Sequence, residues 1–490
     1  MNDSIKLLAK GAALLFVTAI ISKVFNFLLR LIIARQLGAE EYGLLSLGLA
    51  VFSIFTIIPL FGLDQSMERN INFYKKENEK RGVILGGIKI SLICSLLSSI
   101  SLYFLSEAIA TNIYHNLELG IILKIFAIAI PIWSINEVIL SSLKGLKKIE
   151  NYSFLKNILD PLLKTMSTII LVLLGYKIIA VAIGFFATYI LTLILSIILI
   201  NKTNLRLWKG EKKDVTKEIL NYSWPLLFAG IASSLVLWID TLMIGYFLGE
   251  AKVGIYNVAA PIAGLISIIG ASTLSLYLVI ITEQHINKLT QSIKDTFIII
   301  TRWIFLISFP ILCLLILESK NIILVSFGET YSEASSVLII ISLGFFINGL
   351  FGPGRLILTS IGKTKFQMIN NFISLFSNIL LNLYLIPRYG ISGAAISTII
   401  SLTIRALLTL IEVVLVLKIH PIDKKLIKLG LISLLTFLIL NNFKINNTPF
   451  ISIITTGVLI LFIYIPLTIL TKSIGNEERT ILNSIKKKIF

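Results

Sequence analysis

Charged residues are scarce in this sequence. Only 14% of its 490 residues are Asp, Glu, Lys or Arg, and 56% are hydrophobic, whereas an ordinary soluble domain carries about 25% charged residues. Apolar runs recur from the first residues to the last, so no stretch is polar enough to form a soluble domain. These proportions exclude a soluble enzyme and a disordered chain, and they indicate an integral membrane protein.

Cysteine and histidine are rarer still. Cys94 and Cys313 both lie in apolar runs, where a free cysteine behaves as a small hydrophobic residue, so no disulfide framework is expected. The histidines are far apart, without cysteine or carboxylate at metal-ligand spacing near them. We therefore expect no metal site and no cofactor. The three histidines are His115, His285 and His420.

A nucleotide-binding loop is also missing. The sequences beginning at Gly145 and Gly362 lack the upstream glycine spacing of a phosphate-binding loop that ends in Lys-Ser/Thr. We therefore expect neither an enzyme nor direct use of ATP, and any energy coupling would come from an ion gradient, the membrane potential or removal of product.

Fourteen apolar runs have about the 20 residues that a helix needs to cross a bilayer. Membrane β-strands need only about 10 residues of alternating character, so run length predicts an all-α polytopic protein. The first run follows a basic segment, as in a secretory signal, but it continues to Ile33 without a small-residue cleavage site and is predicted to be retained. The predicted spans are 9–34, 42–64, 82–105, 119–143, 153–174, 178–200, 219–248, 254–281, 294–317, 334–358, 366–387, 390–418, 425–443 and 449–471.

Positive charge is distributed unevenly between the loops. The even-numbered loops, the two tails and the span ends beside them hold 29 of the 44 Lys and Arg residues, whereas the odd-numbered loops hold six, at most one in each. Cytoplasmic loops collect positive charge, so both termini are predicted to be cytoplasmic in a cell (plasma) membrane. The basic loops are short and lack interleaved aromatics, which favours anionic membrane lipids over nucleic acid as partners. The six outer residues are Arg35, Lys177, Lys252, Lys320, Arg388 and Lys444.

The two halves of the chain contain similar segments. Each half has a pair of glycines five positions apart at the start of a predicted span. The two segments are Gly38–Gly43 and Gly249–Gly254, and they lie 211 residues apart. A second pair, beginning at Tyr176 and Tyr389, is 213 residues apart. An offset of six helices preserves orientation, so the halves would be related by an axis along the membrane normal. The predicted parts are an N-terminal lobe at 1–200, a cytoplasmic linker at 201–218, a C-terminal lobe at 219–418, and two extra helices with a basic tail at 419–490.

The spans contain more basic than acidic residues. Charge inside a membrane is costly and usually faces the bundle interior or a cavity, so the interior is predicted to be cationic and to suit an anionic head group. Polar side chains also form stripes at helical spacing. The basic residues are Lys23, Arg30, Lys89, Lys124, Lys156, Lys164, Arg302, Arg355 and Arg405, the acids are Glu137, Asp160, Asp240 and Glu412, and the eleventh span carries Asn371, Ser374, Asn378 and Asn382.

Several of these charges have a structural interpretation. Asp160 can pair with Lys164 one turn away, while Lys89, Lys156 and Arg302 lie near enough to the cytoplasmic end to extend to the surface. For these residues the structural interpretation is favoured over a substrate role.

Four of the remaining cations are the candidates for binding substrate. Asp240 could carry a proton or a sodium ion, or it could pair with Arg30, and both interpretations stay open. Glu412 is the second candidate for ion coupling. The bend Gly352–Gly354 before Arg355 could be a hinge or a packing kink. The predicted substrate-binding residues are Lys23, Arg30, Arg355 and Arg405.

Short motifs in both halves of the sequence resemble those of a known protein family. The chain resembles polysaccharide flippases of the multidrug/oligosaccharidyl-lipid/polysaccharide exporter superfamily over roughly residues 5–418. The resemblance rests on short motifs in both halves: Arg30, Arg35, Gly38, Glu41, Tyr42, Gly43, Gly62–Asp64, Arg69, Tyr222–Pro225, Asp240, Gly249–Tyr256, Phe327–Tyr331 and Ser360–Lys363.

The resemblance implies two six-helix lobes, alternating access through a cationic central cavity, and a lipid-linked oligosaccharide cargo carried by its polyprenyl phosphate or diphosphate head. A monomer is expected, with H⁺ or Na⁺ as possible coupling ions. The alternatives are an ion-coupled exporter of multidrug or other small organic compounds, a peptidoglycan-precursor flippase, and a non-transporting scaffold. The first span lacks the acidic residues that multidrug members often use, which weakens the exporter interpretation.

Overall fold

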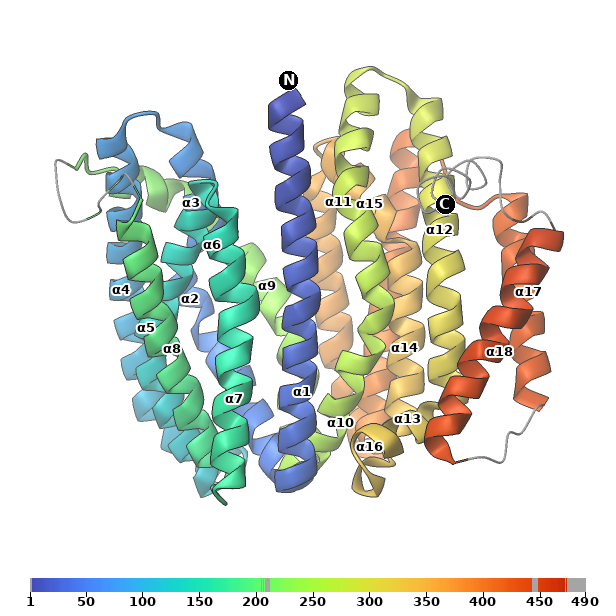
Figure 1. Cartoon of the computed structure of the whole chain (residues 1–490), viewed down its shortest axis with the longest axis horizontal. Helices are drawn as coiled ribbons and strands as arrows, with labels where there is room; N and C mark the ends of the chain where they lie inside the picture. Colours follow the sequence, from blue (N-terminus) through green and yellow to red (C-terminus); the bar gives the residue numbers. More distant parts are fainter. Residues whose placement is uncertain are drawn as a thin grey trace. The chain divides into compact units, whose positions relative to one another are not determined.

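The computed structural model describes residues 2–203, 205, 207, 212–442, 448–471 and 473, and within these ranges it contains helices and turns but no β-strand. Figure 1 shows the helices with their labels. The chain forms two compact units, Met1–Asn257 and Val258–Phe490. The all-α prediction is confirmed. The predicted lobe boundary at the 201–218 linker stays a prediction.

Nine helices in the described ranges are long and apolar enough to cross a membrane. Two helical segments of 54 residues each contain a bend at one glycine, Gly38 (φ 86°) and Gly390 (φ 61°), where the positive φ favours glycine. Each bend therefore joins two predicted spans into one assigned helix. The total of fourteen spans stays a prediction.

The first unit is built from α1 to α9 and the start of α10. A π-helical stretch, Phe154–Leu159, joins α6 to α7. The bounds are α1 Asn2–Phe55, α2 Ile57–Leu60, α3 Leu63–Phe73, α4 Glu77–Ala108, α5 Leu117–Gly145, α6 Ile149–Ser153, α7 Asp160–Leu173, α8 Ile178–Asn201, α9 Thr216–Leu248 and α10 Glu250–Ala263.

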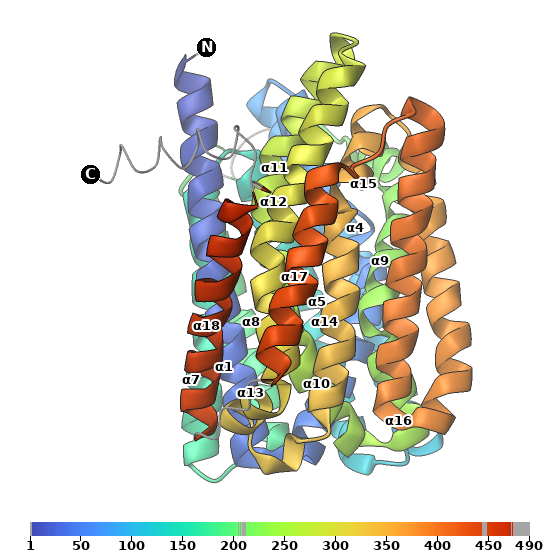
Figure 2. The same cartoon turned by 90° about the vertical axis from the view of Figure 1, so that its right-hand side faces the viewer.

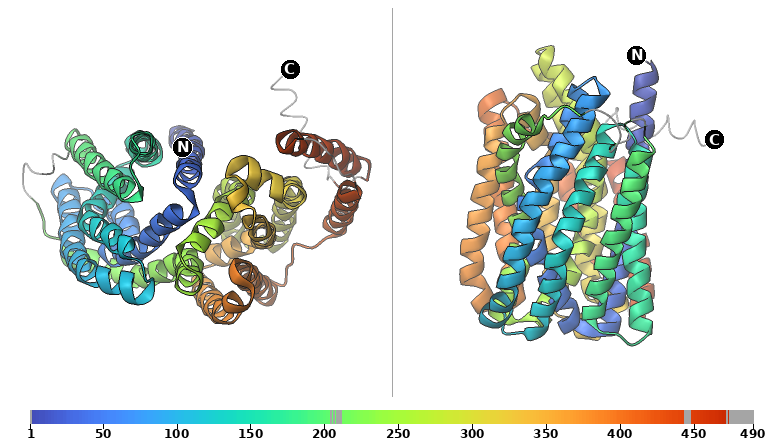
Figure 3. Two further views of the ribbon diagram at one scale, coloured as in Figure 1. Left: turned by 90° about the horizontal axis from the view of Figure 1, so that it is seen from below. Right: turned by 90° about the vertical axis from the view of Figure 1, so that its left-hand side faces the viewer.

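The long helices of this unit stand beside one another, and α4, α5 and α8 are visible in the right-hand view of Figure 3. Their inner faces bury Met67 of α3, Ile84 of α4 and Leu143 of α5 in one hydrophobic core. Their outer faces expose large apolar side chains such as Phe104, at 77%. An apolar outer face matches hydrocarbon, and the helices satisfy their own backbone hydrogen bonds, as a membrane requires.

The described residues of the linker dock on the start of α4. The Arg81 guanidinium donates two hydrogen bonds to the Leu205 carbonyl, at 3.0 and 2.5 Å. The Lys213 amide donates to the Asn78 carbonyl at 3.2 Å. The hydrogen bonds from Thr216 lower the pKa of the Asp214 carboxyl, which keeps it ionised at the start of α9. Arg81, read from sequence only as a topology signal, therefore also fixes the linker.

The two repeated glycine segments pack against each other. Gly38 (φ 86°, ψ 179°) and Gly249 (φ 83°, ψ 174°) have nearly the same backbone conformation. A Cβ on Gly43 would overlap the Glu250 carbonyl and lie 2.6 Å from its carbon. A Cβ on Gly254 would overlap the Ala39 carbonyl, 2.8 Å from its carbon. The contact is reciprocal, with the same 211-residue offset on both sides, which supports the predicted duplication.

The second unit contains the remaining helices, which surround separate hydrophobic clusters. Cys313 is buried in one of these clusters and is free, as is Cys94 in the first unit, so the prediction of two unpaired cysteines is confirmed. The bounds are α11 Leu265–Ile286, α12 Thr290–Leu317, α13 Ser319–Ser326, α14 Ala334–Leu350, α15 Gly352–Ser360, α16 Thr364–Leu417, α17 Lys424–Asn442 and α18 Pro449–Leu470.

The last two helices, α17 and α18, lie side by side (Figure 2) and are fixed to the unit by a buried acid. One carboxylate oxygen of Glu318, between α12 and α13, accepts hydrogen bonds from Ser452 at 2.9 Å and Thr456 at 2.6 Å. The other oxygen accepts from Asn321 at 2.6 Å. Sequence reasoning missed Glu318 because it follows a span and reads as a loop residue.

Replacing Glu318 by alanine is expected to loosen α18, because it leaves two hydroxyl groups and one amide without their acceptor. Each buried polar group left unsatisfied costs about 1–3 kcal/mol of folding free energy. Hydrogen exchange should accelerate in 449–470 and stay unchanged in α4 and α5. Glu318→Gln keeps the size and one acceptor oxygen and should have a smaller effect. Unchanged exchange in 449–470 of the alanine variant would show that apolar packing alone fixes the helix.

Candidate functional site

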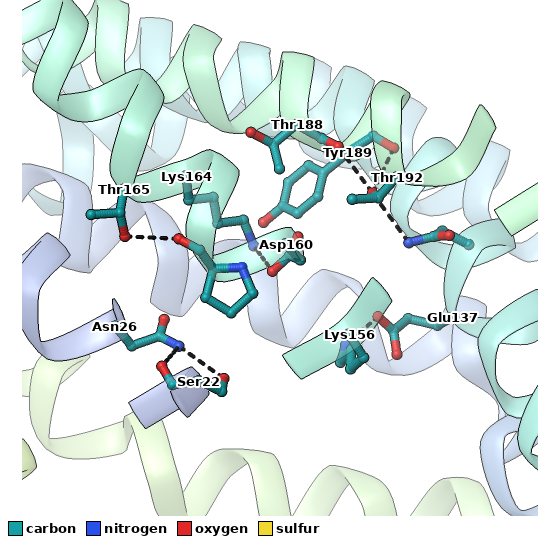
Figure 4. A network of polar contacts seen from close by, with 12 residues as sticks. Ser22, Asn26, Glu137, Lys156, Asp160, Lys164, Thr165, Thr188, Tyr189 and Thr192 are labelled. Atoms are coloured by element: carbon teal, nitrogen blue, oxygen red, sulfur yellow. Dashed lines mark hydrogen bonds and ion pairs between the residues drawn. The ribbon is translucent and has the colours of Figure 1, made fainter. Parts of the chain in front are cut away.

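Four intramembrane charges of the first unit neutralise one another in two ion pairs (Figure 4). Lys164 on α7 contacts Asp160 at 2.8 Å, one helical turn away, which confirms the predicted pair. Lys156, in the π-helical stretch, contacts Glu137 on α5. Lys156 therefore pairs with a different helix, whereas Lys164 pairs within its own helix, α7.

Aromatic rings complete the surroundings of these lysines. The Lys164 ammonium lies 4.5 Å from the Tyr189 ring centroid and 5.6 Å from that of Phe185. The Lys156 ammonium lies 5.9 Å from the ring of Trp133. A cation over an aromatic face is stabilised by the ring quadrupole. With a carboxylate and a ring as partners, each lysine has little free capacity for an anionic ligand.

The prediction that Lys156 and Arg302 extend to the surface is wrong. Lys156 turns toward Glu137, and Arg302 on α12 is only 6% exposed. For Lys156, the Glu137 carboxylate replaces the water that a side chain extending to the surface would reach. Lys89 is exposed, as predicted. Lys124, counted among the interior cations, contacts Glu107 at 2.5 Å.

Lys23 and Arg30 lie on α1 and differ from these paired lysines. Lys23 is exposed and Arg30 is half-buried. Neither side chain has a hydrogen bond or an ion pair with any described residue. The helix that carries them is held to α7, where the Thr165 hydroxyl donates to the Phe25 carbonyl at 3.2 Å. Both cations are thus held on a fixed helix with their charge uncompensated.

The second unit brings Arg355 and Arg405 together. Arg355 lies on α15, immediately after the bend at Gly352–Gly354, and Arg405 lies on α16. They are near enough for their positive charges to repel one another. Arg405 donates a hydrogen bond to the Asn348 side chain of α14 at 3.0 Å, while its buried Nε has no acceptor in the described structure.

These two arginines have no acidic partner among the described residues. The backbone of Arg355 is held by the Gln367 amide, which donates to its carbonyl at 2.6 Å. Each guanidinium group can donate two parallel hydrogen bonds, the chemistry that suits a phosphate-like anion. Sequence reasoning missed Asn348, although it is the only amide in the predicted span 334–358.

Glu412, one of the two candidates for ion coupling, lies on α16. Its carboxylate accepts a hydrogen bond from Asn370 at 2.8 Å and has no basic partner in the part of the chain that the structure describes. Asn370 is 2% exposed and begins the buried polar stripe that continues through Ser374 and Asn378. The prediction that the stripe begins at Asn371 is wrong by one residue, because the buried members follow a strict spacing of four.

Asp240, the other candidate, is buried on α9 at 9% exposure. The Tyr256 hydroxyl of α10 donates to its carboxylate at 2.9 Å, and next to it Thr241 donates to Asn257 at 3.2 Å. Asp240 therefore lies among polar groups where α9 meets α10, the two helices that the glycine segment Gly249–Gly254 joins.

Three or more metal-ligating side chains do not come together anywhere in the described residues. The donor groups near the candidate site are guanidinium and amide nitrogens, which bind anions and not metal ions. The arrangement can hold an anionic group, and it offers one buried carboxylate, Asp240, and one half-buried carboxylate, Glu412, that could take up a cation.

Most of the chain is similar to known protein families and to proteins whose names refer to glycan transport. The family model "Polysaccharide biosynthesis protein" matches residues 8–279, and the model "MatE" matches residues 225–384. A "probable low-salt glycan biosynthesis flippase" of Haloferax volcanii is 25% identical over 401 residues, covering 82% of both chains. A "putative O-antigen transporter" of Shigella flexneri is 23% identical over 384 residues, covering 77% of this chain and 90% of its own.

A solved structure agrees in fold. The lipid II flippase MurJ in an inward closed conformation superposes with a TM-score of 0.77 at 20% sequence identity, covering 94% of this chain and 99% of the other. At this identity the match establishes a shared fold alone.

Proposed function

The chain belongs to the polysaccharide biosynthesis protein family, and from this premise we propose that it is a flippase, which moves a lipid-linked oligosaccharide or polysaccharide repeat unit from the cytoplasmic to the outer leaflet by alternating access. The observation that carries the proposal is the division among its intramembrane cations. Lys124, Lys156 and Lys164 are paired with carboxylates, whereas Arg355 and Arg405 have no carboxylate partner among the described residues.

An unpaired charge inside a membrane is costly, so a site that keeps two of them is expected to have an anionic ligand. A polyprenyl phosphate or diphosphate supplies that anion, and the hydrocarbon chain can stay in the lipid around the protein. Lys23 and Arg30 on α1 are the proposed head-group contacts of the first unit. The glycan-related names of the two relatives support this cargo.

Asp240 and Glu412 are the proposed ion-coupling residues. Each is held by a neutral hydrogen-bond donor, Tyr256 or Asn370, which remains compatible with either protonation state of the acid. A proton or a sodium ion taken up there could bias one conformation over the other. We further propose that the protein lies in the cell membrane with both termini in the cytoplasm and that it functions as a monomer.

Export of cationic drugs is the second candidate, supported by the MatE match to residues 225–384. That match covers a smaller part of the chain than the polysaccharide family model, and the Arg355–Arg405 pair would repel a cationic compound. The flippase is therefore the better-supported function.

Depleting the protein in its source cell is expected to trap the lipid-linked glycan in the inner leaflet. The measurement compares labelling of the glycan by a membrane-impermeant reagent on intact cells and on inverted vesicles. Labelling should decrease on cells and increase on vesicles. An unchanged distribution, together with new sensitivity to cationic dyes, would favour the exporter.

A further inference from the structure

The first unit contains a cavity of about 320 Å³ that the cationic residues do not line. It lies between the end of α1, the α2–α3 turn, α5 and α9. This volume is at the lower end of the roughly 300–1,000 Å³ typical of small-ligand sites, enough for a single ring and its substituents. The lining residues are Ser53, Thr56, Ile57, Leu60, Gly62, Asp64, Gln65, Trp133, Leu226, Leu227 and Ser234.

The wall of the cavity depends on a glycine. Gly62 has φ 68° and caps α3, and a Cβ there would overlap Leu226 Cβ and lie 2.9 Å from the Ser223 carbonyl oxygen. The turn therefore approaches the α9 backbone closely and places Asp64 in the first turn of α3, where the helix dipole favours a negative charge. This gives a structural reason for the Gly62–Asp64 motif.

The cavity combines an aromatic ring with unused hydrogen-bonding groups. The Trp133 ring is held edge to face against Phe52, with centroids 5.7 Å apart. Asp64, Gln65 and the Ser234 hydroxyl have no hydrogen-bond partner among the described residues. The structure thus offers one flat apolar surface and several acceptors and donors to the same small ligand.

The chemistry of these groups points to one class of ligand. A pyranose ring has an apolar C–H face that can stack on an indole and a rim of hydroxyl groups, each donor and acceptor. A carboxylate accepts from such hydroxyls, while an amide or a serine hydroxyl both donates and accepts. The cavity contains a carboxylate and no basic side chain, so it disfavours phosphate.

We propose that this cavity, lined by Asp64, Gln65, Trp133 and Ser234, binds a sugar ring of the lipid-linked glycan, separately from the cationic residues that bind its phosphate. The proposal rests on the proposed function. It assigns the anionic and the neutral parts of one substrate to sites of opposite polarity, so that the glycan adds to the affinity of the head group.

The test uses purified full-length protein and two probes, the lipid-linked glycan extracted from the source cells and the same lipid after enzymatic removal of its sugars. Trp133→Ala is expected to weaken binding of the glycosylated lipid at least tenfold and to leave binding of the bare lipid diphosphate unchanged. Arg405→Ala should weaken both. Trp133→Phe, which keeps a ring, should retain most of the affinity, and Trp303→Ala on α12 controls for loss of an indole elsewhere.

The outcomes separate the two proposals. If the wild-type protein binds both lipids and Trp133→Ala changes both equally or neither, the sugar site is wrong and the flippase stands. If the wild-type protein binds neither lipid, both proposals fall. If Asp64→Asn abolishes binding of a cationic dye but not of the glycosylated lipid, the cavity is a cation site and the sugar assignment is overturned.

Discussion

Replacing Arg405 by alanine is expected to slow the movement of lipid-linked glycan by roughly 10- to 100-fold. A hydrogen bond to a charged group contributes about 1.5–3 kcal/mol, and each 1.4 kcal/mol is about a factor of ten. Arg405 donates to Asn348 and has a buried Nε without an acceptor in the described structure. Without the substrate, this charged group therefore keeps an unsatisfied hydrogen-bond donor. The measurement is the initial rate at which labelled glycan appears outside cells that depend on the variant.

Two substitutions make this result specific. Arg405→Lys keeps the charge but loses the planar pair of donors, so an intermediate rate is expected. Lys124→Ala also removes an intramembrane cation, but this lysine is already paired with Glu107 and partly exposed, and exposed ion pairs contribute little to stability. Equal effects of Lys124→Ala and Arg405→Ala would mean that the transport rate reflects general destabilisation and not an anion site.

Adding one methyl group at Gly43 is expected to destabilise the first unit by about 1–3 kcal/mol, the usual cost of overpacking. The new Cβ would overlap the Glu250 carbonyl, which belongs to a helix backbone and cannot rotate away as a side chain could. Gly430→Ala is the matched control, because a Cβ there meets nothing within 4 Å. The measurement is thermal unfolding of the purified protein in detergent. The midpoint of unfolding should be lower for Gly43→Ala than for the wild-type protein and should not decrease for Gly430→Ala.

The reciprocal contact also predicts coupling between the two repeats. Once Gly43→Ala has separated the helices, Gly254→Ala should cost less than it does alone, so the double variant is less destabilised than the sum of the single variants. Strict additivity would show that the two glycines do not share one contact.

Much of the fold follows from the sequence because the bilayer restricts it. Long apolar runs can only be helices, and the glycines at 38 and 249 are readable as a repeat because no other residue tolerates that conformation as well. The pairing of charges is a different matter. Lys164 and Asp160 are one turn apart and were predicted, whereas Lys156 and Glu137 are on different helices and meet through a π-helical stretch that periodicity does not reveal.

The same limit applies to the candidate site. The cations were identifiable because charge is rare in a span, but their partners depend on helix rotation and register. Asn348 lies 57 residues from Arg405, and the choice between Asn370 and Asn371 is a rotation of about 100°. The sugar cavity is made of ordinary residues from four segments, and the Gly62–Asp64 motif was its only trace in the sequence.

The most direct test of the flippase proposal is reconstitution of the purified protein into liposomes with labelled lipid-linked glycan in the inner leaflet. An added hydrolase that cannot cross the membrane reports the glycan that reaches the outside. The account predicts protein-dependent hydrolysis that Arg405→Ala reduces at least tenfold and Lys124→Ala leaves nearly unchanged. Hydrolysis at the protein-free rate, with folded wild-type protein and several lipid carriers, would contradict it.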